Sequence, residues 1–358
     1  MLPRIENATD FLVEPHTLVD TEGEKLCAIL KATFELVPGP PRGADGSFEA
    51  APRARRRPIR AADIPWGEPE KSSIAYPSDL CVSKPGTDII VVARAYAPGG
   101  ESAPSFEAGV KLGKVHKIIR INGPRVFAAN GDSITRPRPL RSIDVRYDFA
   151  YGGSDTTEED FKEDARNPVG IGVSLNPASL DGAMAPQIED PLDPITRANG
   201  SFKPAGLGVI GRHWEPRRKL WGTHDAGWLK NRAPLPPRDF DQRANFAATP
   251  ELVHVPPLRG GEEGGMTNLS SAHETLTFVL PRLRTTMIFK TKGQNPVSFT
   301  PFIDTIILDT RFLPMTLNEA GTLVPPPLTE MVIELVQRAS IPAPRKPSDV
   351  TIIVEEKR

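Results

Sequence analysis

The sequence contains few cysteines and no long apolar run, and both absences restrict what the protein can be. Only two cysteines occur in 358 residues, Cys27 and Cys81, and neither belongs to a Cys-x-x-Cys pair. Two isolated thiols are typical of a reducing compartment rather than of a disulfide scaffold. The N-terminus shows no apolar signal region, and no segment reaches the ~18 apolar residues of a membrane span. We therefore expect a cytoplasmic protein without membrane insertion.

The chain also lacks an excess of charge of either sign. It has 44 basic and 45 acidic residues, which leaves a formal net charge of −1. This balance does not favour nucleic-acid binding, because affinity for a phosphate backbone depends on clustered cations. The longest basic stretch, residues 53–60 (RARRRPIR), is short and interrupted by Pro58. We expect it to be solvated or at a strand edge, with a docking surface for an acidic partner as the alternative.

Motifs for catalysis and for metal or cofactor binding are missing as well. The sequence contains no Gly-x-Ser-x-Gly elbow and no Gly-x-x-x-x-Gly-Lys-Ser/Thr phosphate loop. His273-Glu274 lacks the second histidine of a His-Glu-x-x-His motif, and the six histidines show no tight ligand spacing. The sequence therefore predicts no catalytic residue, no cofactor and no metal.

Two alternatives to this prediction stay open. His213 and His224 could form a metal site with nearby acidic residues. A hydrolase, for example a carbohydrate-active one, could use paired carboxylates brought together by the loops of residues 222–263. The acidic candidates in these loops are Asp225, Asp239, Asp241, Glu262 and Glu263.

Proline, in contrast, is abundant. The chain has 39 prolines and 29 glycines, and its proline share is about twice the usual ~5%. The prolines are spread along the chain, with clusters at residues 38–41, 234–237, 256–257 and 325–327. Because proline breaks helices and is confined to turns and strand edges, this composition predicts little helix. The apolar runs between the prolines argue against disorder.

Alternating and β-branched runs predict strands in the first 150 residues and again after residue 265. Residues 26–37 alternate with period two, residues 88–97 are rich in valine and isoleucine, and residues 106–112 and 115–121 form a hairpin around Gly113-Lys114. Later strands are expected at 275–280, 284–290, 303–309, 331–339 and 350–354, with the first two of these paired across a short turn. We therefore predict a mostly β fold: an antiparallel β-sandwich or barrel-like sheets, with a long ordered Gly/Pro-rich loop region and little helix.

Three regions follow from this pattern. Residues 1–150 form an N-terminal antiparallel β region, residues 151–265 an ordered loop-rich insertion packed on the sheets, and residues 266–358 a C-terminal β region that could be continuous with the first. A short helix is predicted at residues 158–165, since Thr156 or Thr157 could cap it and acidic residues suit its first turn. The insertion carries Trp214, Trp221 and Trp228, which we expect to pack on the sheets or to form a binding surface.

Residues 147–172 are predicted to join the strands to the loop region. Three aromatic residues are expected to alternate along a strand end, a double glycine to turn the chain, and an Asn-Pro pair with two further glycines to lead into the loops. No βα unit follows these glycines, so they are not a dinucleotide fingerprint. The candidate structural-junction or binding-surface residues here are Tyr147, Phe149, Tyr151, Gly152, Gly153, Asn167, Pro168, Gly170 and Gly172.

The order of several short motifs resembles a known bacterial family. These motifs include Tyr147-Asp148-Phe149-Ala150-Tyr151-Gly152-Gly153, Asn167-Pro168-Val169-Gly170-Ile171-Gly172, Ala185-Pro186-Gln187-Ile188-Glu189, Pro204-Ala205-Gly206-Leu207-Gly208, Gly222-Thr223-His224-Asp225, Arg232-Ala233-Pro234-Leu235-Pro236 and Leu258-Arg259-Gly260-Gly261-Glu262. The family is a domain of unknown function encoded beside the VgrG/PAAR spike genes of type VI secretion systems. The resemblance covers nearly the whole chain and is tightest at residues 84–281.

This resemblance implies a non-enzymatic adaptor or chaperone that helps to load a toxic effector onto the spike. The implied partners are a secreted effector protein and/or the VgrG/PAAR spike proteins, and the family offers no catalytic residues to carry over. The hydrolase described above is the alternative, and a structural component of the secreted spike is a second one. Co-secretion with the spike is compatible with either of the two secretion roles.

Overall fold

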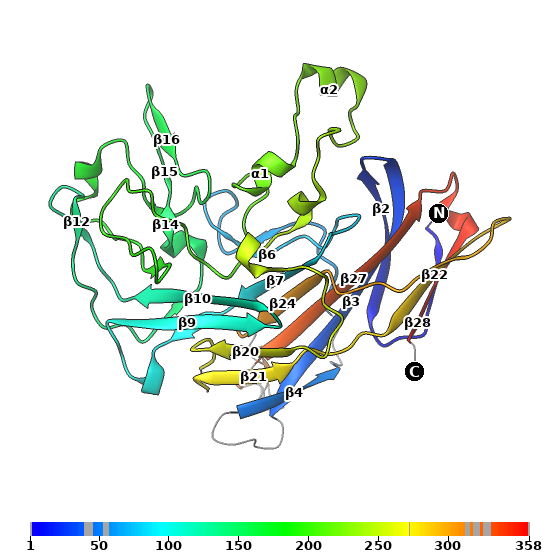
Figure 1. Cartoon of the computed structure of the whole chain (residues 1–358), viewed down its shortest axis with the longest axis horizontal. Coiled ribbons are helices and arrows are strands. Elements are labelled where there is room, and N and C mark those ends of the chain that lie inside the picture. The colour runs from blue at the N-terminus through cyan, green and yellow to red at the C-terminus, as the bar shows by residue number, and fades with distance from the viewer. Residues whose placement is uncertain are drawn as a thin grey trace.

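A computed structural model describes residues 2–38, 46–52, 57–271, 273–311, 316–317, 323–324 and 331–356. This part of the chain is mostly β and holds two short α-helices, α1 (Arg217–Leu220) and α2 (Ala226–Asn231). A twelve-stranded open sheet runs through the molecule, with a four-stranded sheet at one end (Figure 1). The prediction of a mostly β protein with little helix is confirmed, but no sheet in the described residues closes into a barrel.

The large sheet draws its strands from both ends of the chain. Its order is β18 (Ile188–Glu189), β10 (Val115–Asn122), β9 (Ser105–Leu112), β20 (Glu263–Thr267), β21 (Thr275–Val279), β4 (Gly46–Pro52), β3 (Gly23–Pro38), β27 (Met331–Pro342), β24 (Thr305–Asp309), β7 (Thr87–Val92) and β19 (Val253–His254), while β2 (Leu12–Asp20) also pairs with β3. Most neighbours are antiparallel, but β7 pairs with β24 and β4 with β21 in parallel. Thus the N-terminal and C-terminal β regions contribute to the same sheet.

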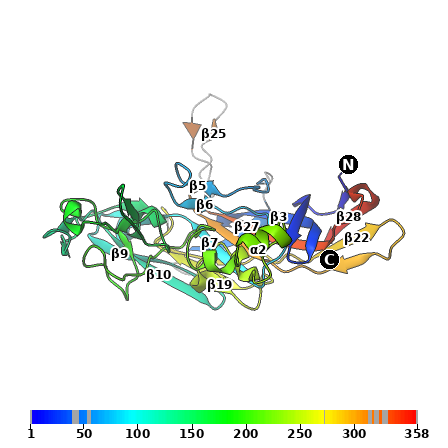
Figure 2. The same ribbon diagram turned by 90° about the horizontal axis from the view of Figure 1, so that it is seen from above.

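The centre of this sheet is buried on both faces. On β3 the predicted period-two residues, from Leu26 to Leu36, join the main hydrophobic core. The residues between them, including Cys27 and Ile29, are buried against a second cluster that contains Val336 of β27. Figure 2 shows β5 (Ile64–Pro65) and β6 (Ile74–Tyr76) over this second face.

A network of charged side chains occupies the same covered face. Glu334 of β27 is fully buried and accepts from Arg57 at 2.5 Å and from Arg60 at 2.6 Å, and its carboxylate lies 3.0 Å from the Lys31 ammonium. Asp79 accepts a further hydrogen bond from Lys31 at 2.7 Å. Burial alone would raise the pKa of Glu334, but the three cations lower it to about 2.

The prediction that the basic stretch 53–60 is solvated or at a strand edge is therefore wrong for two of its arginines. Arg60 is 8% exposed, and Arg57 also pairs with Asp309 at 2.9 Å. The carboxylates that neutralise them lie far away in the sequence, on β24 and β27, so local charge counting could not reveal the pairing. Residues 53–56 lie outside the described residues.

The smaller sheet corrects a predicted strand pairing. Its order is β1 (Arg4–Asn7), β28 (Val350–Glu356), β22 (Thr285–Thr291) and β23 (Val297–Phe299). Residues 284–290 were expected to pair with residues 275–280, yet β22 pairs with β28 and β23, and β21 stays in the large sheet. The chain leaves the large sheet after Leu280, where Pro281 cannot donate to a ladder. Met287 and Phe289 then join the same core as β3.

Apart from β18, β19 and the start of β20, residues 151–265 form a layer of irregular chain, very short strands and the helices α1 and α2 beside β10 and β7, drawn mainly in green in Figure 1. The predicted helix at 158–165 is wrong, because a hairpin of β15 (Ser154–Thr156) and β16 (Phe161–Glu163) takes its place. Thr157 caps the hairpin turn, its Oγ1 accepting from the backbone N–H of Asp160 at 3.0 Å. Within the described residues, no helix has the length and apolar character needed to cross a membrane.

Candidate functional site

Asn167 organises the junction at residues 147–172. Its side chain is fully buried, and its Nδ2 donates to the carbonyl oxygens of Tyr147 and Tyr151, each at 2.9 Å. Its own carbonyl accepts from the backbone N–H of Gly153 at 2.8 Å. The expected alternation of three aromatics along a strand end is wrong, since Tyr147–Phe149 form a 3₁₀ turn and Tyr151 begins the short strand β14 (Tyr151–Gly152). One amide group therefore holds the turn and the strand together.

Glycine is required at two positions around Asn167. Gly152 has φ +143°, and a Cβ there would lie 2.2 Å from the Asn167 carbonyl oxygen. A Cβ on Gly170 would lie 2.3 Å from Asn167 Nδ2. Gly153 and Gly172 also have positive φ, and Pro168 is half-buried. Close approach of the backbone, rather than phosphate binding, accounts for these glycines.

The three tryptophans differ in exposure. Trp214 is 1% exposed and meets Tyr147 edge to face, with ring centroids 5.7 Å apart. Trp221 and Trp228 are half-buried: Trp221 packs on Phe240, and Trp228 donates to the Leu235 carbonyl oxygen at 2.9 Å. Phe149 is half-buried beneath the Arg146 guanidinium. These aromatics thus order the loop layer.

The acidic candidates of residues 222–263 make local contacts. Asp225 caps α2 by accepting from the Trp228 N–H at 2.7 Å. Asp239 accepts from the N–H and hydroxyl of Thr223, and Asp241 pairs with Arg243 at 2.6 Å. Glu262 accepts from the Arg259 N–H at 3.2 Å, while Glu263 is exposed on β20. Each of the first four residues serves a turn of its own rather than a shared centre.

The two histidines suggested for a metal site also make local contacts. His213 Nε2 accepts from Trp214 Nε1 at 3.0 Å, and His224 packs edge to face on Trp228. In the part of the chain that the structure describes, no three His, Cys, Asp or Glu residues come together to hold a metal ion.

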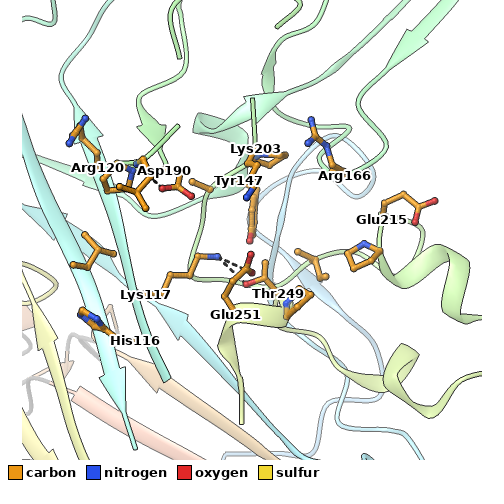
Figure 3. A pocket seen from close by; sticks show the side chains of 18 of the residues that line it. His116, Lys117, Arg120, Tyr147, Arg166, Asp190, Lys203, Glu215, Thr249 and Glu251 are labelled. Atoms are coloured by element: carbon orange, nitrogen blue, oxygen red, sulfur yellow. Dashed lines mark hydrogen bonds and ion pairs between the residues drawn. The ribbon is translucent and has the colours of Figure 1, made fainter. Parts of the chain in front are cut away.

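A pocket of about 790 Å³ opens beside the junction, between β10, the turn η5 (Pro250–Leu252) and irregular segments from residue 190 to 216 (Figure 3). Four prolines and several aliphatic side chains form its walls. Its charged residues are four basic and four acidic ones: Lys117, Arg120, Arg166, Lys203, Glu107, Asp190, Glu215 and Glu251. The opposite charges balance, so the pocket has no net attraction for a polyanion or a polycation.

Lys117 forms the polar floor of this pocket. Its Nζ donates to Thr249 Oγ1 at 3.0 Å and lies 3.6 Å from Glu251 Oε2 (Figure 3). Burial lowers the pKa of Lys117, and the nearby Glu251 carboxylate opposes this effect. Partial burial alone would raise the pKa of Glu251, but the Lys117 charge together with hydrogen bonds from its own backbone, Thr249 and Lys117 lowers it. The ion pair is long, and the side chain of Glu251 is 61% exposed.

Tyr147 contributes the most unusual group of the pocket. The residue is 2% exposed, and its hydroxyl makes no hydrogen bond although the Thr249 hydroxyl is nearby. Burial and the Glu251 charge raise its pKa. Figure 3 shows the ring directed towards Thr249 and Glu251. Trp214 holds the ring on one side, and Gly206 leaves room on another, because a Cβ there would lie 2.6 Å from the ring.

A comparison with known protein families identifies the family of this chain. Residues 21–317 match a family model described as "Uncharacterized protein conserved in bacteria (DUF2169)". The chain belongs to this family. The DUF2169 match contains every residue that lines the pocket, whereas β1 and β28 of the smaller sheet lie outside it. No curated protein and no solved structure matches the chain.

Sequence reasoning found one wall of this DUF2169 pocket and missed the rest. Tyr147 was a candidate and Pro204 and Ala205 belong to a quoted motif, but the other lining residues come from segments between 107 and 251 that lie outside these motifs. Lys117 gave a weak signal, because it is a charged residue between Val115 and Ile119, two buried residues on the same face of β10. Only the fold brings Lys117, Tyr147 and Thr249 together.

Proposed function

We propose that this DUF2169 protein is an adaptor or chaperone of a type VI secretion system. In the bacterial cytoplasm it would bind a toxic effector and help to load it onto the VgrG/PAAR spike. The motif order within residues 147–262 supports this function, and three residues of those motifs, Tyr147, Pro204 and Ala205, line the pocket. Family membership is compatible with the proposal but carries no function of its own.

The observation that carries the binding role is the pocket itself. It is large, it has balanced charge and apolar walls, and one deeply buried hydroxyl at its floor has no partner. Binding sites combine apolar walls with a few placed polar groups in this way. The acidic residues suggested for a hydrolase instead cap turns, which favours the binding role over the hydrolytic one.

Co-expression with the neighbouring effector and spike genes tests the proposal. We expect a stable complex with the effector, the spike tip or both when the tagged protein is purified. Failure to form a complex with any of these neighbours, each shown to be folded, would contradict the proposal. Asp225→Ala and Glu262→Ala serve as controls: they should leave the complex intact, whereas a hydrolase using these carboxylates would lose its activity.

A further inference from the structure

The edge of the large sheet beside the pocket is partly open. Among the described strands, β18 pairs with β10 only at Arg120 and Ile121, and the preceding residues of β10 have β9 as their one strand neighbour. The Asn122 N–H points away from β9, since it donates to the Gln187 carbonyl oxygen at 2.7 Å. The N–H and C=O groups of successive residues point to opposite edges of a strand. Ile118 and His116, four and six residues before Asn122, therefore direct these groups to the same outer edge as Asn122.

These two residues also line the pocket, which extends along this edge. A second hollow of about 400 Å³ crosses β9, β10, β20 and β21 and shares Glu107, His116 and Ile118 with the pocket. The two hollows adjoin at these three residues, and together they are called the depression. The side chain of Ile118 is 39% exposed at their border, and Leu192 at the rim is 94% exposed. A long depression with exposed aliphatic residues fits an extended chain better than a compact small molecule.

The unpartnered hydroxyl of Tyr147 lies in the deep part of this depression. Leaving a buried hydroxyl without a hydrogen bond costs on the order of 1–3 kcal/mol. A polypeptide backbone supplies a carbonyl acceptor and an N–H donor at every residue, and either group can satisfy a tyrosine hydroxyl. The balanced charges of the lining favour a segment without strong net charge.

We propose that an extended, mainly apolar segment of a partner polypeptide pairs with the open edge of β10 at His116 and Ile118. One of its backbone groups bonds the Tyr147 hydroxyl, and an apolar side chain fills the pocket between the prolines. Main-chain bonds to a sheet edge give affinity in this mode of recognition, and the side-chain pocket gives specificity. This assignment rests on the proposed adaptor function for the identity of the partner, but the site can be tested without it.

Two substitutions separate the contributions of the edge and of the hydroxyl. Tyr147→Phe keeps the ring between Trp214 and Gly206 and removes only the hydroxyl. Ile118→Pro removes an N–H that points outward and leaves the ladder to β9 complete, a placement at which proline is tolerated. Ile118→Thr is the matched control, because it shortens the side chain but keeps the N–H and a β-branched shape.

The first probe is an array of overlapping 15-residue peptides from the effector that co-purifies with the protein. Fluorescence anisotropy with the bound peptide should give about tenfold weaker binding for Tyr147→Phe, as expected for one lost hydrogen bond, and at least that for Ile118→Pro. Ile118→Thr should bind the peptide within about threefold of the wild type. Two further peptides carry N-methyl groups at alternate backbone nitrogens, one at odd and one at even positions. Only the peptide whose methylated nitrogens face β10 should lose binding.

The outcomes distinguish the site from the function. An effector complex that survives both Tyr147→Phe and Ile118→Pro would overturn the site and leave the adaptor function standing. If no effector complex forms, a phage library of random dodecapeptides is selected on the wild type instead. Enrichment of apolar sequences that lose binding to both variants would support the site alone, and identical selections on wild type and variants would overturn it. A lower melting temperature for Tyr147→Phe would assign the hydroxyl a structural role and also overturn the assignment.

Discussion

Replacing Glu334 by glutamine should destabilise the protein strongly at neutral pH and hardly at all in acid. The carboxylate is fully buried among Lys31, Arg57 and Arg60, and its pKa is lowered from 4.5 to about 2. At about 1.4 kcal/mol per pKa unit, this shift corresponds to about 3 kcal/mol of stabilisation by the ionised form. Glutamine leaves the buried Lys31 and Arg60 and the half-buried Arg57 with only Asp79 and Asp309 as partners, and removing one partner of a buried pair costs about 3–5 kcal/mol.

The lowered pKa of Glu334 determines the direction in which the stability difference changes with pH. Because the pKa in the folded state lies below that in the unfolded state, the stabilisation is complete above roughly pH 5 and is lost as the pH falls towards 2. Urea unfolding of the wild type and Glu334→Gln at pH 7, 5, 4 and 3 should therefore show a difference that narrows by about 2 kcal/mol between pH 5 and 3. Glu355→Gln, on an exposed carboxylate of β28, is the control and should show no such narrowing.

Two results would refute the reasoning. If Glu334→Gln is as stable as the wild type at pH 7, the network does not favour the charged carboxylate. If the difference between the two proteins stays constant as the pH falls, the loss comes from packing and not from charge.

Three further predictions concern the junction and the Cys27 thiol. Asn167→Ala should lower the free energy of unfolding by about 2–4 kcal/mol, since two buried carbonyl groups lose their donor. The same substitution should speed amide exchange at residues 147–172. The control Asn231→Ala, at an exposed position, should change neither the free energy of unfolding nor the exchange. Gly152→Ala should prevent folding or lower the melting temperature sharply, because its Cβ would meet the Asn167 carbonyl. The control Gly182→Ala, at φ +77° with open space around it, should lower the free energy of unfolding by only about 1 kcal/mol. Equal effects of the two substitutions would contradict the close approach at Gly152. Cys27, which is fully buried, should not react with a thiol reagent at pH 8 in the native state, because burial raises the pKa of its thiol to about 12. It should react in urea, and rapid labelling mapped to Cys27 in the folded protein would disprove the burial.

Patterns local to the sequence predicted local structure well. The alternation along residues 26–37, the β-branched run of β7 and the Gly113-Lys114 turn correspond to strands and a hairpin in the structure. Gly113 has φ +57°, which a tight two-residue turn needs and which glycine adopts without strain. In these segments a few neighbouring residues carry the whole signal.

One local feature was predicted wrongly, and features that depend on distant residues could not be predicted. The acidic run at 158–160 suits a helix start, yet the segment forms a hairpin whose turn Thr157 stabilises. Arg57 and Arg60 look like a surface patch until β27 brings Glu334 beneath them. The pocket could not be predicted either, because Lys117, Tyr147 and Thr249 carry no shared motif and meet only after the loop layer packs on β10.

The position of β27 between β3 and β24 also affects synthesis on the ribosome. β3 is made before β27, which emerges about 300 residues later, so the centre of the large sheet cannot close until β27 has left the ribosome. Until then, the ammonium of Lys31 and the guanidinium groups of Arg57 and Arg60 lack the carboxylate of Glu334. Because such long-range pairing is slow, the nascent chain exposes unpaired strands for an extended time.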